Sequence, residues 1–416
     1  MRILILGAGV IGVSTAYELL RTGHDVTVID RKPEPALETS YGNAGLIAPG
    51  HSYAWTTPKL PKNLFKSLYD KQRAFRFTFQ WDLAMWRWGL QFIRQCTQTK
   101  MAENTRRKYR LSIYSQSHFQ RLIDETGIQY HGNREGLIYI FRSTESFLEG
   151  QEKLALLQPL MKNLQLVSRT ELLELEPALQ GTKTQIKGGI YCSTDESGSC
   201  RDFTLLLSEI CRDQGVDFHF NTTVTEIIKK GGEIEKVISD KGDFYADVYV
   251  LSFAAYSPWF SKMVGDYLPI YPVKGYSFTV PIIDMDKAPT HGGIDEDNLL
   301  AFSLIGDRIR FTSVAEISGY DTTYTPSDFI NMVKLANSLF PDAFDFSQIE
   351  YWAGLRPMTP NGAPIFGRGK MKNLYYNTGH GHLGWSMCTG SARITADLIE
   401  GRKVEIDLEG MTLDTL

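Results

Sequence analysis

The sequence predicts an α/β fold in which a sheet of parallel strands alternating with helices is interleaved with a second unit of mixed sheet and helices. An apolar run at 3–6 is followed by a glycine-rich turn, a helix-favouring stretch and a second apolar run at 26–29, the pattern of a parallel β-α-β unit. A second strand-to-helix turn rich in glycine occupies 378–385. Strand-like runs at 272–281 and 308–314 stand apart from both turns and indicate the mixed sheet.

The first glycine-rich turn has the spacing of a Rossmann-like dinucleotide fingerprint. Gly7 permits a tight turn, Gly9 lets the backbone approach a pyrophosphate, and Gly12 lets the helix pack closely on the strand. The free N–H groups at the start of the helix suit phosphates, and an acid after the second strand suits the adenosine ribose. We therefore predict dinucleotide binding by Gly7, Gly9, Val10, Ile11, Gly12, Asp30 and Arg31.

The second glycine-rich turn distinguishes between the two common dinucleotides. A plain NAD domain has no need of it, whereas the isoalloxazine ring of FAD needs support away from the diphosphate. Reduced flavin carries negative charge near N1 and C2=O, and a helix N-terminus with free N–H groups stabilises that charge. The turn at 378–385 leads into an expected helix at 386–400, so the sequence favours FAD.

Between the two turns the chain alternates between expected helices and strands. Small residues at 38–47 are, on composition alone, an ordinary loop. Apolar periodicity predicts helices at 102–126, 145–160, 166–179 with a stop at Pro177, 203–213 ending at Gly215, and 326–340. Strands are expected at 136–141, 189–191, 216–220, 224–229, 235–239, 246–252, 350–353 and 374–377, and the block 203–252 is expected to extend the first sheet.

Composition narrows the function classes. The 416 residues leave room for two or three domains, and a net charge of −4 argues against nucleic-acid binding, which favours a basic excess. Five cysteines without a CxxC pair predict reduced thiols in a cytoplasmic protein, and no metal-ligand pattern is present. The uncharged run 3–17 resembles a signal peptide, but the fingerprint glycines explain it better.

Six segments carry a family resemblance. They read GAGVIG at 7–12, VTVIDR at 26–31, ETSYGNAGLIAPG at 38–50, PVKGYS at 272–277, GLRPMTPNGAPIFGR at 354–368 and NTGHGHLGWSMCTGS at 377–391. Together they resemble the FAD-dependent D-amino-acid oxidase superfamily, and within it the bacterial D-amino acid dehydrogenase small-subunit family. The resemblance spans essentially the whole chain. It implies an FAD-binding domain of 1–55, 188–265 and 350–416 interleaved with a substrate domain of 56–187 and 266–349.

The resemblance also implies how the cofactor is held. The flavin would be lined by Ser40, Asn43, Ala44, Gly45 and Leu46, and Val224 would contact the adenine through its backbone. Many relatives have glutamine where this chain has Leu46. The pyrimidine edge would be held by Gly379, His380, Gly381, His382, Leu383 and Gly384. Sarcosine-oxidase relatives attach FAD through a cysteine after Gly-Leu-Arg-Pro; here Met358 and no cysteine follow, so we expect non-covalent FAD.

Three residues are catalytic candidates: Arg356, Tyr276 and His382. Arg356 matches the arginine that binds the substrate carboxylate across the superfamily; from the residues alone, a structural salt bridge is the competing explanation. Tyr276 and His382 are expected near the substrate, with core packing and capping of the helix start as their alternatives. Weaker candidates for the same pocket are Tyr271, His51 and Tyr53.

The resemblance implies oxidative deamination of D-amino acids to 2-oxo acids and ammonia, by hydride transfer to flavin N5, with electrons passed to a quinone-type acceptor of the respiratory chain. Alternatives in the same superfamily are a glycine or sarcosine oxidase and a D-hydroxyproline dehydrogenase. More distant alternatives are an FAD-containing RNA-modifying protein, which the acidic charge disfavours, and a non-catalytic flavin subunit of a larger complex.

Residues 53–95 differ from the rest of the chain, because aromatic residues crowd there and basic residues outnumber acidic ones from 59 to 94. Three interpretations are open: the core of the substrate domain, peripheral docking on an anionic membrane surface, and contact with a partner subunit. Basic residues interleaved with aromatic ones suit the headgroup region of a bilayer. Docking would place the protein at the inner face of the cell membrane, where electrons can pass to a quinone.

Overall fold

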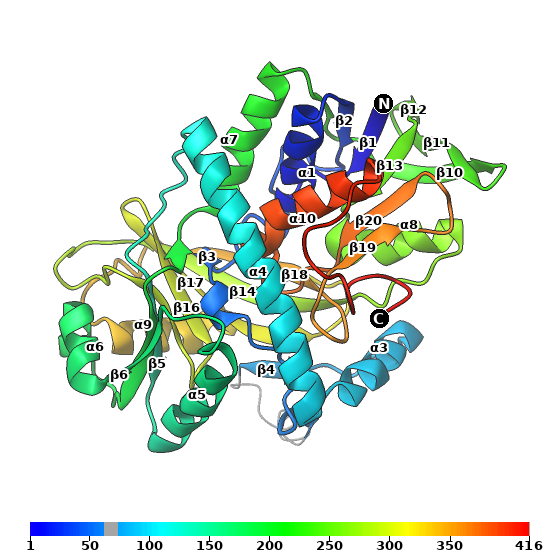
Figure 1. The fold of residues 1–416 in the computed structure, drawn as a ribbon. Helices are drawn as coiled ribbons and strands as arrows, with labels where there is room; N and C mark the ends of the chain where they lie inside the picture. Colours follow the sequence, from blue (N-terminus) through cyan, green and yellow to red (C-terminus); the bar gives the residue numbers. More distant parts are fainter. Residues whose placement is uncertain (62–73, 416) are drawn as a thin grey trace.

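The structure, a computed structural model, describes residues 1–61 and 74–415. A six-stranded sheet forms the nucleotide-binding part, with the strand order β19-β20-β13-β1-β2-β9 (Figure 1). Its neighbouring strands are parallel except for the pair β19–β20. Its members are β1 (Arg2–Leu6), β2 (Asp25–Ile29), β9 (Asp217–His219), β13 (Val248–Leu251), β19 (Ile365–Arg368) and β20 (Leu374–Thr378).

Both faces of this sheet are covered, as a parallel sheet requires. Alternate side chains of β1 point to opposite faces. Ile3 and Ile5 pack beneath the helices, and Leu4 and Leu6 pack beneath a separate three-stranded sheet and helix α8. The helical layer is α1 (Val10–Arg21), α7 (Cys200–Asp213), α10 (Gly384–Ile399) and the long α4 (Gln98–Thr126). The other layer is β10 (Val224–Lys230), β11 (Glu233–Ser239), β12 (Gly242–Phe244) and α8 (Ser257–Val264).

A nine-stranded mixed sheet forms the second unit, with the order β18-β14-β17-β16-β15-β5-β7-β6 and β4 paired to β17. Its strands are β4 (Phe75–Phe77), β5 (Leu137–Phe141), β6 (Leu164–Ser168), β7 (Gly188–Cys192), β14 (Tyr271–Pro281), β15 (Gly292–Asp295), β16 (Leu300–Ile305), β17 (Arg308–Ile317) and β18 (Glu350–Met358). The other α-helices of the described residues are α3 (Leu83–Arg94), α5 (Thr144–Leu157), α6 (Arg169–Leu175) and α9 (Ile330–Leu339). The predicted combination of a nucleotide-binding parallel sheet with a mixed-sheet unit is confirmed.

Two sequence-based expectations about elements are wrong. The helix expected at 166–179 begins with a strand instead, because Leu164–Ser168 pairs with β7 along its whole length. Helix α6 starts only after Ser168, whose hydroxyl and the side chain of Glu171 form a capping box. The hairpin of β10 and β11 does not extend the first sheet; with β12 it forms a sheet of its own.

The assignment of two strands to the FAD-binding part also changes. Strands β7 and β18, from the expected FAD-binding segments 188–265 and 350–416, lie in the nine-stranded sheet. The expected strand at 350–353 runs on to Met358, since β18 pairs with β14 over nine residues. Arg356 therefore lies within β18, two residues before its end. The remainder of the domain division stays a prediction.

Candidate active site

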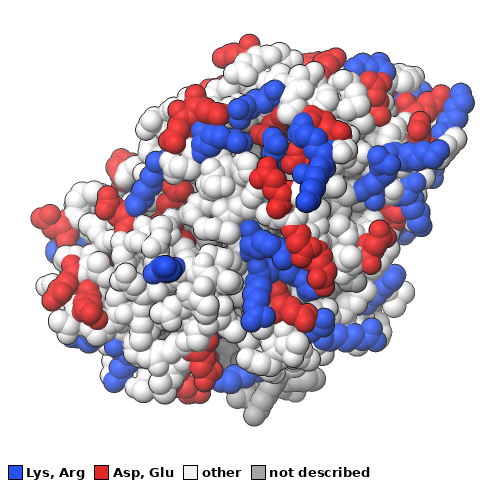
Figure 2. Space-filling view, viewed as in Figure 1, with Lys and Arg blue, Asp and Glu red and all other residues white. Residues whose placement is uncertain are grey.

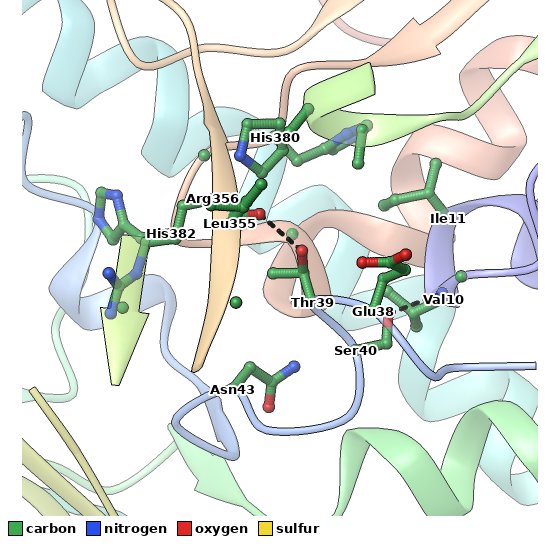
Figure 3. Close-up of a pocket in the computed structure, with 18 of the residues that line it drawn as sticks. Val10, Ile11, Glu38, Thr39, Ser40, Asn43, Leu355, Arg356, His380 and His382 are labelled. Atoms are coloured by element: carbon green, nitrogen blue, oxygen red, sulfur yellow. Dashed lines mark hydrogen bonds between the residues drawn. The ribbon is translucent and has the colours of Figure 1, made fainter. Parts of the chain in front are cut away.

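A cavity of about 430 Å³ lies where the six-stranded sheet meets the nine-stranded sheet. Its walls come from the turns that follow β1 and β20, from the loop 38–46, and from β14, β17 and β18. The C-terminal ends of parallel strands are the usual binding edge of such a sheet. In Figure 3, Val10 and Ile11 lie at one end of the cavity and Arg356 and His382 at the other.

The predicted fingerprint glycines occupy the first end. Gly7 has φ +115°, and a Cβ there would lie 2.7 Å from the carbonyl oxygen of Ser252. A Cβ on Gly12 would overlap the carbonyl of Gly7, so Gly12 brings α1 close to β1 without lining the cavity itself. Gly9, Val10 and Ile11 do line it. Only glycine at positions 7 and 12 permits this close approach of backbone to backbone.

Asp30 organises the turn around the expected adenosine end. Its carboxylate accepts hydrogen bonds from the backbone N–H of Ala8 (2.7 Å) and of Lys32 (2.8 Å) while it lines the cavity. Burial raises the pKa of Asp30, and these two hydrogen bonds oppose the rise. Arg31 pairs with Glu38 at 2.5 Å and lies over the ring of Tyr256. The lining also includes Arg31 and Val224.

The small-residue loop runs along the middle of the cavity. The backbone N–H of Val10 donates to Ser40 Oγ at 3.0 Å (Figure 3). The backbone N–H of Gly45 donates to Asn43 Oδ1 at 3.0 Å. Thr39 Oγ1 donates to the carbonyl of Leu355 at 2.6 Å, which ties the loop to β18. The structure brings together in this wall all five expected flavin-lining residues, Ser40, Asn43, Ala44, Gly45 and Leu46.

The second glycine-rich turn closes the cavity near the start of α10. The lining includes His380, Gly381, His382, Leu383 and Gly384. Gly379, with φ +78°, lies behind the wall. The imidazole of His380 hydrogen-bonds to Ser391 Oγ, two turns into α10, at 2.9 Å, and burial lowers the pKa of His380 to about 3, so it is a neutral group that ties the turn to the helix. Helix α10 begins at Gly384, so its N-terminus faces the cavity.

Arg356 is a cation without a carboxylate partner. Its Nη1 donates to the carbonyl of Val314 (2.9 Å) and more weakly to that of Lys274 (3.4 Å). Among the described residues, no acidic side chain lies within ion-pair distance of it. Burial lowers the pKa of Arg356 to about 10, which leaves it cationic at neutral pH. The competing explanation, a structural salt bridge, therefore finds no partner in the part of the chain that the structure describes.

A glycine that the sequence analysis overlooked makes room for this arginine. A Cβ on Gly275, which lies two residues along β14 from Val273, the cross-strand partner of Arg356, would overlap the guanidinium. Gly275 lines the cavity, whereas Tyr276 does not, because successive side chains of a strand point to opposite faces. Tyr276 instead donates to Glu316 at 2.6 Å, and its ring packs on Phe329. The placement of Tyr276 near the substrate is not supported.

The three weaker pocket candidates, Tyr271, His51 and Tyr53, also differ in whether they line the cavity. His51 lines the cavity and pairs with Glu296 at 2.5 Å. Tyr271 points away and donates to Asp82 at 2.9 Å, and Tyr53 is absent from the lining. Trp55, which the sequence analysis left within its aromatic segment, stacks on His382 with ring centroids 4.5 Å apart. A sequence pattern does not reveal this contact, because the two residues are far apart in the chain.

The site fits a flavin dinucleotide. It offers a glycine cradle that side chains would fill, a helix N-terminus at each glycine-rich turn, and at the far end a cation that no acid of the described residues pairs with. No cysteine is among the described residues that line the cavity. The described residues include no group of three or more His, Cys, Asp or Glu side chains placed to hold a metal ion.

Comparisons with known proteins agree with this site. Residues 2–398 match the family model described as FAD dependent oxidoreductase. The chain is 42% identical to D-amino acid dehydrogenase 2 of Mesorhizobium japonicum, covering 99% of each chain, and 40% identical to D-amino acid dehydrogenase of Granulibacter bethesdensis, covering 98% and 97%. The fold resembles the crystal structure of glycine oxidase from Geobacillus kaustophilus, with a TM-score of 0.79 at 20% identity over 99% and 98% of the chains.

The fold and the cavity thus define a flavin-dependent oxidoreductase of the mixed α/β type. The chain belongs to the FAD-dependent oxidoreductase family, and its relatives at about 40% identity are named D-amino acid dehydrogenase. The predicted family, fold class and FAD cofactor are confirmed.

Proposed function

We propose that this chain catalyses the oxidative deamination of D-amino acids to 2-oxo acids and ammonia. The observation that carries the proposal is Arg356, a cation in the cavity wall that hydrogen-bonds to carbonyl groups and lies over the ring of Trp55, with no acidic partner among the described residues. A guanidinium binds a carboxylate in a bidentate, directional way, which fixes the orientation of an amino acid. The names of the relatives at about 40% identity point to the same substrate class.

The side chains around Arg356 position the substrate. FAD, when bound, supplies the hydride acceptor. Gly275 leaves space for the guanidinium, and His382, stacked on Trp55, forms the adjoining wall. Positioning of this kind lowers the barrier because the entropy of orientation is lost on binding rather than in the reaction. The N-terminus of α10, which faces the cavity, would stabilise negative charge on a bound flavin.

Steady-state turnover with an artificial dye as acceptor tests this proposal. We expect dye reduction with D-amino acids, release of ammonia and 2-oxo acid in equal amounts, and little hydrogen peroxide when the dye is omitted. Dominant peroxide formation with glycine or sarcosine would assign the chain to the oxidase alternatives instead.

We further propose that the physiological acceptor is a quinone and that the protein docks on the membrane through the outer face of α3. Leu83, Leu90 and Ile93 recur on one side of this helix and are 88%, 60% and 50% exposed, and Trp81 beside them is 94% exposed. The opposite side, with Met85, Trp88 and Phe92, packs into the protein. A helix that is apolar on its outer side suits the acyl-headgroup boundary, where quinones are accessible.

The charge pattern of this region suits an anionic bilayer. Arg87 and Arg94 lie on the same helix, whereas Lys62, Lys66, Lys71 and Arg73, which also contribute to the basic excess of 53–95, lie outside the described residues. Over the face that Figure 2 shows, basic and acidic side chains are otherwise interspersed. In the part of the chain that the structure describes, no helix combines the length and apolar character needed to cross a membrane.

A further inference from the structure

Helix α4 carries a lysine that points into the protein beside the active site. Lys108 lies along this long helix, which crosses the face of the molecule in Figure 1, and its side chain is 1% exposed. Its Nζ donates to the carbonyl of Tyr53 at 2.6 Å and lies 3.3 Å from His382 Nε2. A buried lysine normally has an acidic partner. None of the described acidic side chains lies within ion-pair distance of Lys108.

The missing acid changes the protonation of Lys108. Burial lowers its pKa to about 7, so the ammonium and the neutral amine have comparable populations near neutral pH. A lysine in this state can give or take a proton at little cost in free energy. Its contact with His382, a residue of the cavity wall, connects that property to the reaction site.

His382 is a neutral imidazole that connects Lys108 to the cavity. Burial, and then the charges of Lys108, His51 and Arg356, lower its pKa well below the usual value. The ring lies nearly parallel to Trp55, at an interplanar angle of 18°. With Nε2 at Lys108, the other ring nitrogen, Nδ1, has no hydrogen-bond partner among the described residues. Stacking and the Lys108 contact thus hold the ring while Nδ1 stays available to a ligand.

The state of Lys108 sets the tautomer of His382. When Lys108 is an ammonium, it donates to Nε2, and the imidazole proton is on Nδ1. When Lys108 is a neutral amine, Nε2 donates its proton to Nζ, and Nδ1 presents a lone pair. Only the second state can accept a proton from a ligand.

We propose that Lys108 is a positioning residue that sets the tautomer of His382, and that the two side chains together accept the proton that a substrate ammonium must lose. The N–H bond of the substrate breaks as its proton passes to Nδ1 of His382. The proton on Nε2 passes to Nζ, which leaves a neutral substrate amine, a neutral imidazole and a Lys108 ammonium. No electrons are transferred in this step, which rests on the proposed amino acid substrate.

The surroundings favour this direction of transfer. Two charged groups face the pair: Arg356 from β18 and His51 from the segment before Tyr53. Glu296, the acid nearest to His51 in the described chain, is already paired with His51. The transfer moves one positive charge from the substrate to Lys108, so its direction depends on which of the two ammonium groups is better held. Once the proton has moved, the Lys108 ammonium is held by the Tyr53 carbonyl and His382 Nε2.

The test compares Lys108→Met and Lys108→Arg with Lys100→Met, an exposed lysine on the same helix, in the FAD-loaded enzyme. The rate of flavin reduction by D-alanine is measured without oxygen from pH 6 to 10. In wild type and Lys100→Met we expect the rate to rise with an apparent pKa near neutrality. In both Lys108 variants we expect a loss of at least tenfold at pH 7 and convergence with wild type above the pKa of free D-alanine, because solution then supplies the neutral amine.

A second readout does not depend on turnover. With ¹⁵N-labelled histidine, the ring of His382 is assigned as the signal that His382→Gln removes. In wild type we expect the His382 ring to change from the Nδ1–H to the Nε2–H tautomer as Lys108 deprotonates. In Lys108→Arg we expect the ring to remain the Nδ1–H tautomer throughout. Unchanged pH profiles in the Lys108 variants, or a His382 tautomer indifferent to pH and to Lys108→Arg, would overturn the proposal. If the wild-type enzyme reacts with no D-amino acid, the proposed function is wrong. The tautomer measurement still tests the coupling between Lys108 and His382 in that case.

Discussion

At the scale of single residues, the site depends on charged groups placed where the protein offers no opposite charge. Among the described residues Arg356 contacts two carbonyl groups and the ring of Trp55 but no acid, and nearby Gly275 has no side chain to crowd it. Burying a guanidinium in this way costs stability unless an anion arrives to pair with it. This arrangement supports the proposed role of Arg356 in binding the substrate, because Arg356 lines the cavity, whereas Arg310, which is held by a hydroxyl and a carbonyl, does not.

Replacement of Arg356 by Met removes that charge. We expect kcat/KM for a D-amino acid to fall by roughly 30- to 1000-fold, corresponding to about 2–4 kcal/mol for a lost charged contact. FAD content and the unfolding temperature should stay at or above wild-type values, because a buried, unpaired charge has been removed. Steady-state kinetics with the dye acceptor measure the effect; equal loss in an Arg310→Met variant, which lies outside the cavity lining, would argue against a direct role.

A second residue-scale prediction concerns acid stability. Burial alone would raise the pKa of Glu296, but His51 and Lys153 lower it to about 2. A carboxyl group whose pKa is lower in the folded state than in the unfolded state stabilises the fold at pH values above its unfolded pKa. This contribution is lost as the pH falls toward 2, the pKa in the folded state. Glu296→Gln should therefore lower the free energy of unfolding by roughly 1–3 kcal/mol at pH 7 and by less than half of that at pH 3. Urea titrations at the two pH values decide this, with exposed Glu174→Gln as the control; a pH-independent loss would contradict it.

At the scale of elements, close backbone contacts hold the dinucleotide end. Helix α1 approaches β1 so closely that no side chain fits at Gly12. Strand β18 is brought beside the small-residue loop through the Thr39–Leu355 hydrogen bond. The geometry of the cavity therefore depends on how these elements pack as well as on the residues that face it.

Gly12→Ala tests the packing of α1. The added Cβ must displace either the helix or the turn at Gly7, which costs about 1–3 kcal/mol. We expect a lower unfolding temperature and loss of FAD on gel filtration, measured by the ratio of flavin to protein absorbance. Gly181→Ala, where a Cβ meets no atom within 4 Å, is the matched control and should retain FAD. Full FAD retention in Gly12→Ala would show that the close approach is unimportant.

Local patterns predicted the dinucleotide end well, because the fingerprint, its helix and the acid lie within one short stretch of chain. The expected acid Asp30 and the glycines at 7 and 9 do line the cavity. The sequence did not predict on which face of β14 the side chain of Tyr276 lies, because that depends on which side of the strand meets the cavity. Lys108 gave no signal either, since a lysine on a polar-faced helix is normally solvated, and only the packing of α4 shows that it is buried.

At the scale of the whole molecule, two sheets enclose the cavity between them while α3 presents an apolar outer face. The cavity collects residues from both ends of the chain, so neither sheet alone forms the site. Electrons that leave such an enclosed site need an acceptor that can approach it. In the membrane-docking proposal, the outward apolar face of α3 is the docking surface, and the lipid-soluble acceptor is reached in the same membrane.

Membrane docking predicts vesicle binding that depends on α3. Leu83, Leu90 and Ile93 changed together to Ser should weaken co-sedimentation with vesicles of phosphatidylcholine and phosphatidylglycerol by roughly 100-fold, at about 1 kcal/mol for each partly exposed side chain. A matched triple change of Leu148, Leu160 and Ile330, which are 55%, 52% and 52% exposed elsewhere, should leave binding intact. Wild-type protein that stays in the supernatant would refute the docking proposal.

The most direct measurement follows the flavin absorbance of the purified holoenzyme without oxygen. D-alanine, D-proline, their L-forms, glycine and sarcosine are added separately, so that the outcome depends on neither the electron acceptor nor the membrane. We predict that the D-amino acids alone bleach the flavin within the time of mixing, with the L-forms inert. Bleaching by glycine or sarcosine alone, or no bleaching of a fully loaded flavin, would contradict the assignment of D-amino acids as the substrate.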